Sequence, residues 1–178
     1  MYMTKMFKSQ YPSQQEIQNI LNYNPETGIF AWKHRNDMRA QWNSKHAGKL
    51  AGALNTDGAV QIKINSILYL AHKLAWIYMY GYCPLVQVDH KDVNPGNNRI
   101  SNLRLATHSE NKCNRRKTIK NKTGYKGVYS YKETGRFCVA ITKEKKQKWL
   151  GIYDTPEEAY AAYCEAAKEY HGEFSRVA

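Results

Sequence analysis

The stretch VQVDHKDVNPGNNRISNLRLATHSENKCNR, residues 86–115, decides the fold of the first part of the chain. Val86 and Val88 alternate with polar residues, which is typical of a short strand. The turn-forming residues 94–98, NPGNN, follow and predict that the chain loops back. The stretch therefore begins with a strand and a loop.

A second strand and a helix complete this unit. Ile100, Leu103 and Leu105 are apolar, and the period-two alternation of a strand places Asn102 and Arg104 together on one face. Thr107 and Glu110 have the spacing of a capping box, which predicts that a helix begins directly after Thr107. The order strand, loop, strand, helix places the chain in the α+β class.

Four polar side chains converge in such a unit. Asp89 and His90 end the first strand, Asn102 comes from the second strand, and Asn111 lies in the first turn of the helix. A histidine can take a proton from water near neutral pH, and carboxylate and amide oxygens are hard ligands for Mg²⁺ or Mn²⁺. Hydrolysis of a phosphodiester needs both functions. Taken singly, each residue would be an ordinary polar or turn residue.

Charge points to the partner. The chain has 27 Lys and Arg against 15 Asp and Glu, a net charge of +12 that concentrates polyanions. Nucleic acid is the first candidate, and an anionic membrane is the weaker one because no apolar run approaches bilayer length and residues 1–10 lack a signal core. We expect a cytoplasmic protein, in the host cell if a phage encodes it. The four scattered cysteines are expected to be free thiols.

A basic run marks a boundary inside the chain. Residues 111–122 contain six basic residues and no acidic one, which favours a helix end that continues into a linker along phosphates. We expect a nuclease region over 1–116, a linker over 117–123 and a second domain over 124–178. In the first region, the patterns predict helices over 13–21 and 69–80 and strands over 27–33 and 59–64.

The second domain is predicted as a sheet backed by a helix. Strand-like runs cover 124–131, 136–142 and 147–153, and their spacing favours an antiparallel meander. Thr155, Pro156 and Glu158 form a helix start, and Gly172 is a plausible stop. Of the charged residues, seven are basic and two acidic over 126–148, whereas two are basic and six acidic over 149–178. The sheet should therefore face DNA.

The Asp89-His90 stretch resembles the ββα-metal core of HNH endonucleases, especially the phage and intron-encoded homing type. The resemblance implies that Asp89 and Asn111 bind one divalent metal, Mg²⁺ or Mn²⁺, and that His90 is the general base. It also implies that Asn102 braces the loop and orients the histidine. Two roles are open for Arg104, holding the scissile phosphate or forming a salt bridge. His72, in a helix, is expected to be structural.

The C-terminal module resembles the plant ethylene-response-factor (Apetala-two) DNA-binding domain, which lays a three-stranded sheet in the major groove. The resemblance rests on GYKGV at 124–128, WLGIY at 149–153, EEA at 157–159 and HG at 171–172. The expected DNA contacts, from linker and strands together, are Arg115, Arg116, Lys117, Lys120, Lys122, Lys126, Tyr129, Tyr131, Arg136, Lys146, Lys148 and Trp149. Sheet packing is the alternative for the aromatic residues.

The sequence thus predicts a divalent-metal-dependent endonuclease that acts on double-stranded DNA, with no obligate protein partner evident. One site in the chain favours nicking, with 5'-phosphate and 3'-hydroxyl ends as the family implies. Two alternatives stay open: a DNA-binding regulator whose nuclease core is inactive, and a structure-selective nuclease that processes phage DNA.

Overall fold

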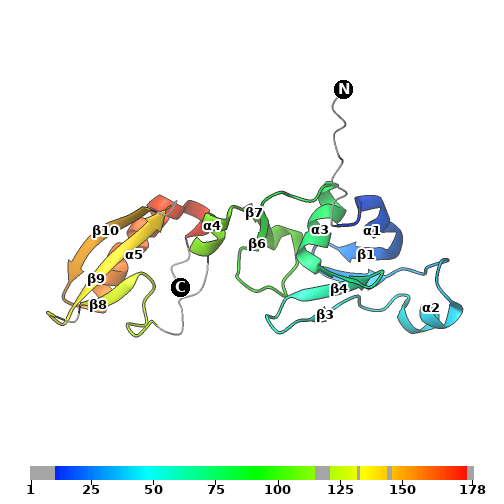
Figure 1. Ribbon diagram of the computed structural model, residues 1–178, viewed down its shortest axis with the longest axis horizontal. Coiled ribbons are helices and arrows are strands. Elements are labelled where there is room, and N and C mark those ends of the chain that lie inside the picture. The colour runs from blue at the N-terminus through cyan, green and yellow to red at the C-terminus, as the bar shows by residue number, and fades with distance from the viewer. Residues whose placement is uncertain (1–10, 115–120, 132, 144–145, 176–178) are drawn as a thin grey trace, which may run out of the picture. The chain divides into compact units, whose positions relative to one another are not determined.

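The computed structural model describes residues 11–114, 121–131, 133–143 and 146–175 (Figure 1). Contacts within the chain group it into two units, Met1–Leu105 and Ala106–Ala178, and each is considered by itself. Helices and short antiparallel sheets occur in both units, so the chain is of the α+β class, as predicted.

The first unit begins with a helix that runs directly into a hairpin. Ser13 caps α1 (Gln14–Ile20) and forms a capping box with Glu16, and the chain continues as β1 (Leu21–Asn24). β1 pairs antiparallel with β2 (Ile29–Trp32). The helix predicted over 13–21 and the strand predicted over 27–33 are present as α1 and β2, but β1 was not predicted.

A three-stranded sheet and a central helix follow. After α2 (Ala40–His46), the strands β3 (Ala53–Leu54), β4 (Val60–Ile64) and β5 (Ile67–Leu70) lie in the order β3-β4-β5. The helix predicted to start at residue 69 is α3 (Ala71–Tyr80) and starts two residues later. The delay arises because Tyr69 and Leu70 pair with β4 in the sheet.

The core of the first unit gathers around α1 and α3, which pack against each other (Figure 1). Its fully buried side chains are Ile17, Leu21, Ile62, Leu74 and Ile77. Val88 and Leu103, from the two strands that flank the polar loop, belong to the same core. The loop is therefore anchored at both of its ends by apolar burial.

The polar loop lies between β6 (Gln87–His90) and β7 (Leu103–Ala106), which pair with each other. The predicted second strand starts later than expected, because Ile100–Asn102 form a 3-10 turn. The placement of Asn102 in a strand was therefore wrong. The Asn102 backbone amide donates to the Arg99 carbonyl, which is a turn bond and not a sheet bond.

The helix α4 (His108–Cys113) starts where the Thr107–Glu110 capping box predicted, and it carries Asn111. It falls in the second unit, since the division lies between Leu105 and Ala106. Lys126 binds it there by donating to the Cys113 carbonyl at the end of the helix. The predicted linker over 117–123 stays a prediction, because residues 115–120 are outside the described residues.

The rest of the second unit is the predicted sheet backed by a helix. The strands β8 (Val128–Tyr131), β9 (Arg136–Lys143) and β10 (Lys146–Tyr153) form an antiparallel sheet in the order β10-β9-β8. α5 (Pro156–His171) runs along one face of it, and the turn η2 (Gly172–Phe174) follows (Figure 1). The Thr155–Glu158 capping box and the stop at Gly172 are confirmed.

Two further expectations concern membranes and thiols. Among the described helices, none has the length and apolarity to cross a membrane. The four cysteines are free and half-buried, as predicted.

A glycine contact in the second unit provides a test of its packing. Gly127 and Gly135 both have positive φ, +76° and +71°, but a Cβ on Gly127 would overlap the Tyr163 ring, whereas a Cβ on Gly135 meets nothing within 4 Å. Both alanine variants should be destabilised by backbone strain. Gly127→Ala should lose about 1–3 kcal/mol more unfolding free energy than Gly135→Ala, because its Cβ overpacks against Tyr163. Urea unfolding of the two variants checks this, and equal losses would contradict it.

Candidate functional site

The loop between β6 and β7 is held together by its own polar side chains. The Asp92 carboxylate accepts hydrogen bonds from the Asn94 backbone amide at 2.9 Å, Asn97 Nδ2 at 2.7 Å and Asn102 Nδ2 at 2.9 Å. These bonds outweigh the opposing effect of burial and lower the pKa of Asp92. The loop therefore keeps a negative charge at its centre, where its amide donors meet.

Asn102 closes this loop from its C-terminal end. Its Oδ1 accepts from the Asp92 backbone amide at 3.1 Å, and its Nδ2 donates to the Asn97 carbonyl at 2.8 Å. The residue thus makes the bracing bonds that the family resemblance implies. The side chain that reaches the ring of His90, however, is that of Asn98 and not that of Asn102.

His90 lies at the end of β6 with 8% of its surface exposed. Its Nε2 is 3.2 Å from Oδ1 of Asn98, a side chain that is only 1% exposed. The sequence prediction did not include Asn98, because an asparagine inside NPGNN reads as a turn former. A fully buried asparagine carbonyl beside an imidazole holds the ring through a specific hydrogen bond.

A second histidine lies against His90. The rings of His72, in α3, and His90 meet edge to face, with centroids 4.9 Å apart and planes at 85°. Nδ1 of His72 is buried and has no hydrogen-bond partner in the described part of the chain. Burial, followed by the nearby His90 and Lys73, lowers the pKa of His72 to about 3. His72 is therefore a neutral ring packed beside the proposed base.

Asp89, the neighbour of His90, forms a buried ion pair. Its Oδ2 accepts from Nε of Arg104 at 3.0 Å, and both side chains are less than 10% exposed. Of the two roles that the sequence left open for Arg104, the structure contains the salt bridge. An arginine this close to a carboxylate compensates for the cost of burying its charge.

The proposed metal ligands are hard oxygen donors. Asp89 has a carboxylate at the end of β6, in the first unit. Asn111 has an amide oxygen on α4, in the second unit. A buried carboxylate next to His90 suits Mg²⁺ or Mn²⁺ better than a soft metal. Within the described ranges, no group of three or more His, Cys, Asp and Glu side chains is placed to hold a metal.

The predicted DNA contacts separate onto the two faces of the β8–β10 sheet. Cross-strand partners share a face, and Trp149 pairs with Ala140, Tyr129 with Cys138 and Tyr131 with Arg136. Trp149 and Tyr129 are 56% and 57% exposed, and Tyr131 and Arg136 are exposed too, so these side chains are not core. We call Tyr129, Tyr131, Arg136 and Trp149 the outer face.

The predicted lysine contacts do not all lie on that face. Lys148 pairs with the core residue Ile141 and contacts the Tyr170 ring of α5, so it points to the helix side. Lys146 shares this parity, Lys122 is exposed, and Lys126 donates to the Cys113 carbonyl. The remaining predicted contacts lie outside the described residues: Arg115, Arg116, Lys117 and Lys120.

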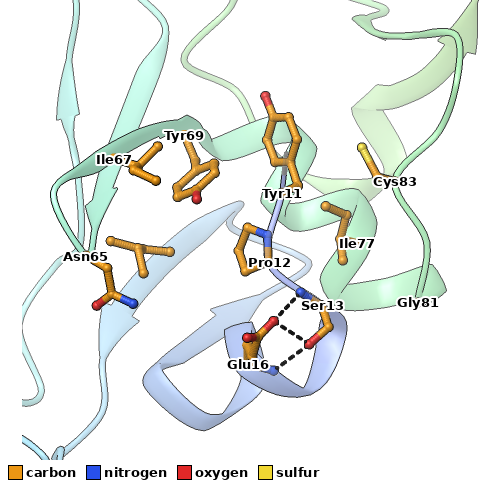
Figure 2. Close-up of a pocket in the computed structure, with 11 residues that line it drawn as sticks. Tyr11, Pro12, Ser13, Glu16, Asn65, Ile67, Tyr69, Ile77, Gly81 and Cys83 are labelled. Atoms are coloured by element: carbon orange, nitrogen blue, oxygen red, sulfur yellow. Dashed lines mark hydrogen bonds between the residues drawn. The ribbon is translucent and has the colours of Figure 1, made fainter. Parts of the chain in front are cut away.

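A separate hollow of about 550 Å³ lies among the start of α1, β5 and α3 (Figure 2). Tyr11, Tyr69 and Ile77 contribute to its lining, and the Ser13–Glu16 capping bonds close one side of it (Figure 2). None of the described candidate site residues lines it. Its polar groups serve to start α1, so the hollow is separate from the His90 site.

The lowered pKa of His72 predicts how stability depends on pH. An unfolded histidine titrates near pH 6.5, whereas folded His72 titrates near pH 3, so only the unfolded chain gains a proton at this site between those values. Acidification from pH 6.5 should therefore favour unfolding by up to about 1.4 kcal/mol per pH unit. The check is urea unfolding of both proteins at pH 7 and at pH 4.5. Between these two pH values, the unfolding free energy of His72→Phe should fall by less than that of the wild type. Equal losses would show that His72 is protonated in the folded protein.

Comparisons with known proteins match both parts of the chain. A family model for HNH endonuclease matches residues 69–113, and one for the AP2 domain matches residues 123–173. The solved structure of the HNH homing endonuclease I-HmuI, described as showing DNA binding and cleavage, covers 87% of this chain and 81% of its own at 21% identity, with a TM-score of 0.44. Protein 3.8 of Escherichia phage T7 is 36% identical over 89 residues, which are 50% of this chain and 73% of that protein. The chain therefore belongs to the HNH endonuclease family, and an AP2 domain follows its nuclease core.

Proposed function

We propose that this protein is a divalent-metal-dependent DNA endonuclease that uses His90 as its general base. The observation that carries the proposal is the buried Asp89-His90 pair at the end of β6, with the His90 ring held by Asn98, in a chain of the HNH family. The contact with Asn98 fixes the His90 ring, and a histidine can take a proton from water near neutral pH.

The reaction needs a nucleophile, charge stabilisation and a leaving group. His90 takes a proton from a water molecule, whose oxygen attacks the phosphorus and displaces the 3' oxygen. The products are a 5'-phosphate and a 3'-hydroxyl. Asp89 and Asn111 would hold one Mg²⁺ or Mn²⁺, which supplies charge stabilisation for the phosphate and the leaving oxygen. Arg104 stabilises the Asp89 carboxylate in the structure, and we propose that it also contacts the scissile phosphate.

We further propose that the second unit binds double-stranded DNA through the outer face of its sheet. Three exposed aromatic side chains and Arg136 share this face, whereas α5 covers the other. Contacts from lysine or arginine to phosphate carry no sequence information, so the basic residues from 115 to 122 should add affinity that falls with salt. The proposed domain division is that of the sequence, with 1–116 for cutting, 117–123 as linker and 124–178 for binding.

The proposed mode of action is nicking at preferred sites, as in phage homing endonucleases. One Asp-His constellation in the chain serves one strand at a time, so a double-strand cut would need a dimer or two successive events. A relative from an Escherichia phage supports a phage setting for the protein.

The nuclease proposal is tested by cutting supercoiled plasmid at low salt. The wild type should convert it to the open-circular form with Mg²⁺ or Mn²⁺, and EDTA should stop the reaction. His90→Ala should lower the rate by a factor of about 10²–10⁴, as expected for loss of a general base. DNA affinity, measured by fluorescence anisotropy, should be unchanged. A protein that binds DNA without metal-dependent cutting would instead be a DNA-binding regulator with an inactive core.

The DNA-binding proposal is tested with two variants that remove the same charge. Arg136→Ala, on the outer face, should weaken duplex binding and reduce the slope of log affinity against log salt by about 1. Lys168→Ala, on the exposed side of α5, is the charge-matched control and should change neither quantity. Equal effects of the two variants would place DNA elsewhere. Trp149→Ala should weaken binding at every salt concentration, since it removes contact area and not charge.

A further inference from the structure

We infer that Asn98 is a positioning residue for the reaction, because its side-chain carbonyl fixes both the orientation of the His90 ring and which ring nitrogen carries the proton. The inference rests on the proposed role of His90 as general base. It adds a residue outside the Asp-His, Asn102 and Asn111 pattern, and it also assigns a task to the hairpin at the start of the chain.

The direction of the Asn98 amide decides the tautomer. Nδ2 of Asn98 donates to the Gly96 carbonyl at 3.3 Å, so Oδ1 is the atom that faces Nε2 of His90 at 3.2 Å. A carbonyl oxygen only accepts, and therefore Nε2 must carry the proton. A neutral imidazole has one N–H, which leaves the basic lone pair on Nδ1. The geometry thus makes Nδ1 the nitrogen that takes a proton from water.

The β1–β2 hairpin holds Asn98 in this position. The Tyr23 hydroxyl donates to the Asn98 carbonyl at 2.7 Å in a buried bond, and the Ile100 amide donates to the Pro25 carbonyl at 3.0 Å. Gly28, with φ +74°, packs so closely on the backbone of Asn98 and Arg99 that a Cβ would overlap it. A turn more than 60 residues away in sequence therefore fixes the residue that binds the base.

His72 limits the ring from another direction. Its ring meets that of His90 edge to face at 4.9 Å, and α3, which carries it, is packed into the core. A ring with a hydrogen bond at Nε2 and an aromatic contact has little freedom to rotate about its side-chain bonds. The two contacts together keep Nδ1 directed to one place.

The first test measures the tautomer in the wild type. Ring ¹⁵N chemical shifts of histidine-labelled protein at pH 8 distinguish Nε2–H from Nδ1–H, and loss of one signal set in His90→Gln assigns His90. We expect the Nε2–H form. An Nδ1–H form would overturn the inference. Because this readout needs no DNA cutting, it can fail or succeed independently of the proposed function.

The second test compares three variants. Asn98→Leu keeps the volume but removes the acceptor, Asn98→Asp keeps an acceptor facing Nε2, and Asn97→Ala removes an asparagine of the same loop that bonds Asp92. Asn98→Leu should lower kcat by about 10–100-fold, the range seen for residues that orient a functional histidine through its second nitrogen. KM for DNA should be unchanged, and the His90 shifts should show a mixture of tautomers.

Asn98→Asp and Asn97→Ala distinguish a positioning role of Asn98 from a merely structural role in the loop. Asn98→Asp should restore the Nε2–H form and most of kcat, and Asn97→Ala should leave the His90 shifts as in the wild type. Loss of kcat in Asn98→Leu with unchanged His90 shifts would overturn the inference, and so would equal shift changes in all three variants. If Asn98→Leu fails to fold, Tyr23→Phe removes only the bond that holds the Asn98 backbone. Its His90 signals should broaden, and unchanged signals would contradict the role of the hairpin.

Discussion

The hydrogen bond between Asn98 and His90 is the contact on which the arrangement of the candidate site in the first unit depends. Buried polar groups need hydrogen-bond partners, and those of Asn98 have them: its Nδ2 donates to the Gly96 carbonyl, and its backbone carbonyl accepts from Tyr23. The stretch matched by the HNH family, residues 69–113, contains the base but not the β1–β2 hairpin that holds Asn98. The β1–β2 hairpin, which lies outside the matched stretch, therefore completes the support of the loop between β6 and β7.

The second consequence concerns the helix that follows the loop. Asp89 and His90 are fixed in the first unit by β6, while Asn111 lies on α4, which the internal contacts assign to the second unit. The Thr107–Glu110 capping box stabilises the start of α4, and Lys126 binds the carbonyl at its end. Lys126, which was predicted to contact DNA, therefore also binds the end of α4. The same domain that we propose to bind DNA also secures the residue that we propose as a metal ligand.

Local sequence signals predicted the elements with strong start and stop residues. Capping boxes at Thr107 and Thr155 mark two helices correctly, and turn residues delimit β8, β9 and β10. The missed elements depend on pairing and burial, which short-range residue signals do not show. β1 and β5 exist because they pair with β2 and β4, and Asn102 lies in a 3-10 turn because its side chain bonds Asp92 and not a sheet neighbour. In the candidate site, Asp89 and His90 could be named from their spacing, but Asn98 could not, since only burial distinguishes it from a turn former.

The faces of the C-terminal sheet show why charge alone does not reveal which side chains share a face. The register between β9 and β10 shifts between Trp149 and Gly151, so alternation counted along β10 does not continue through the strand. Before this shift Lys148 lies on the helix side, and Trp149 on the outer face. The outer face consequently has three aromatic side chains, Tyr129, Tyr131 and Trp149. Arg136 is its one guanidinium among the described residues. Aromatic rings give contact area, and a single arginine can read at most one guanine bidentately. In the proposed DNA-binding role, this face would therefore recognise the shape of the duplex more than its base sequence.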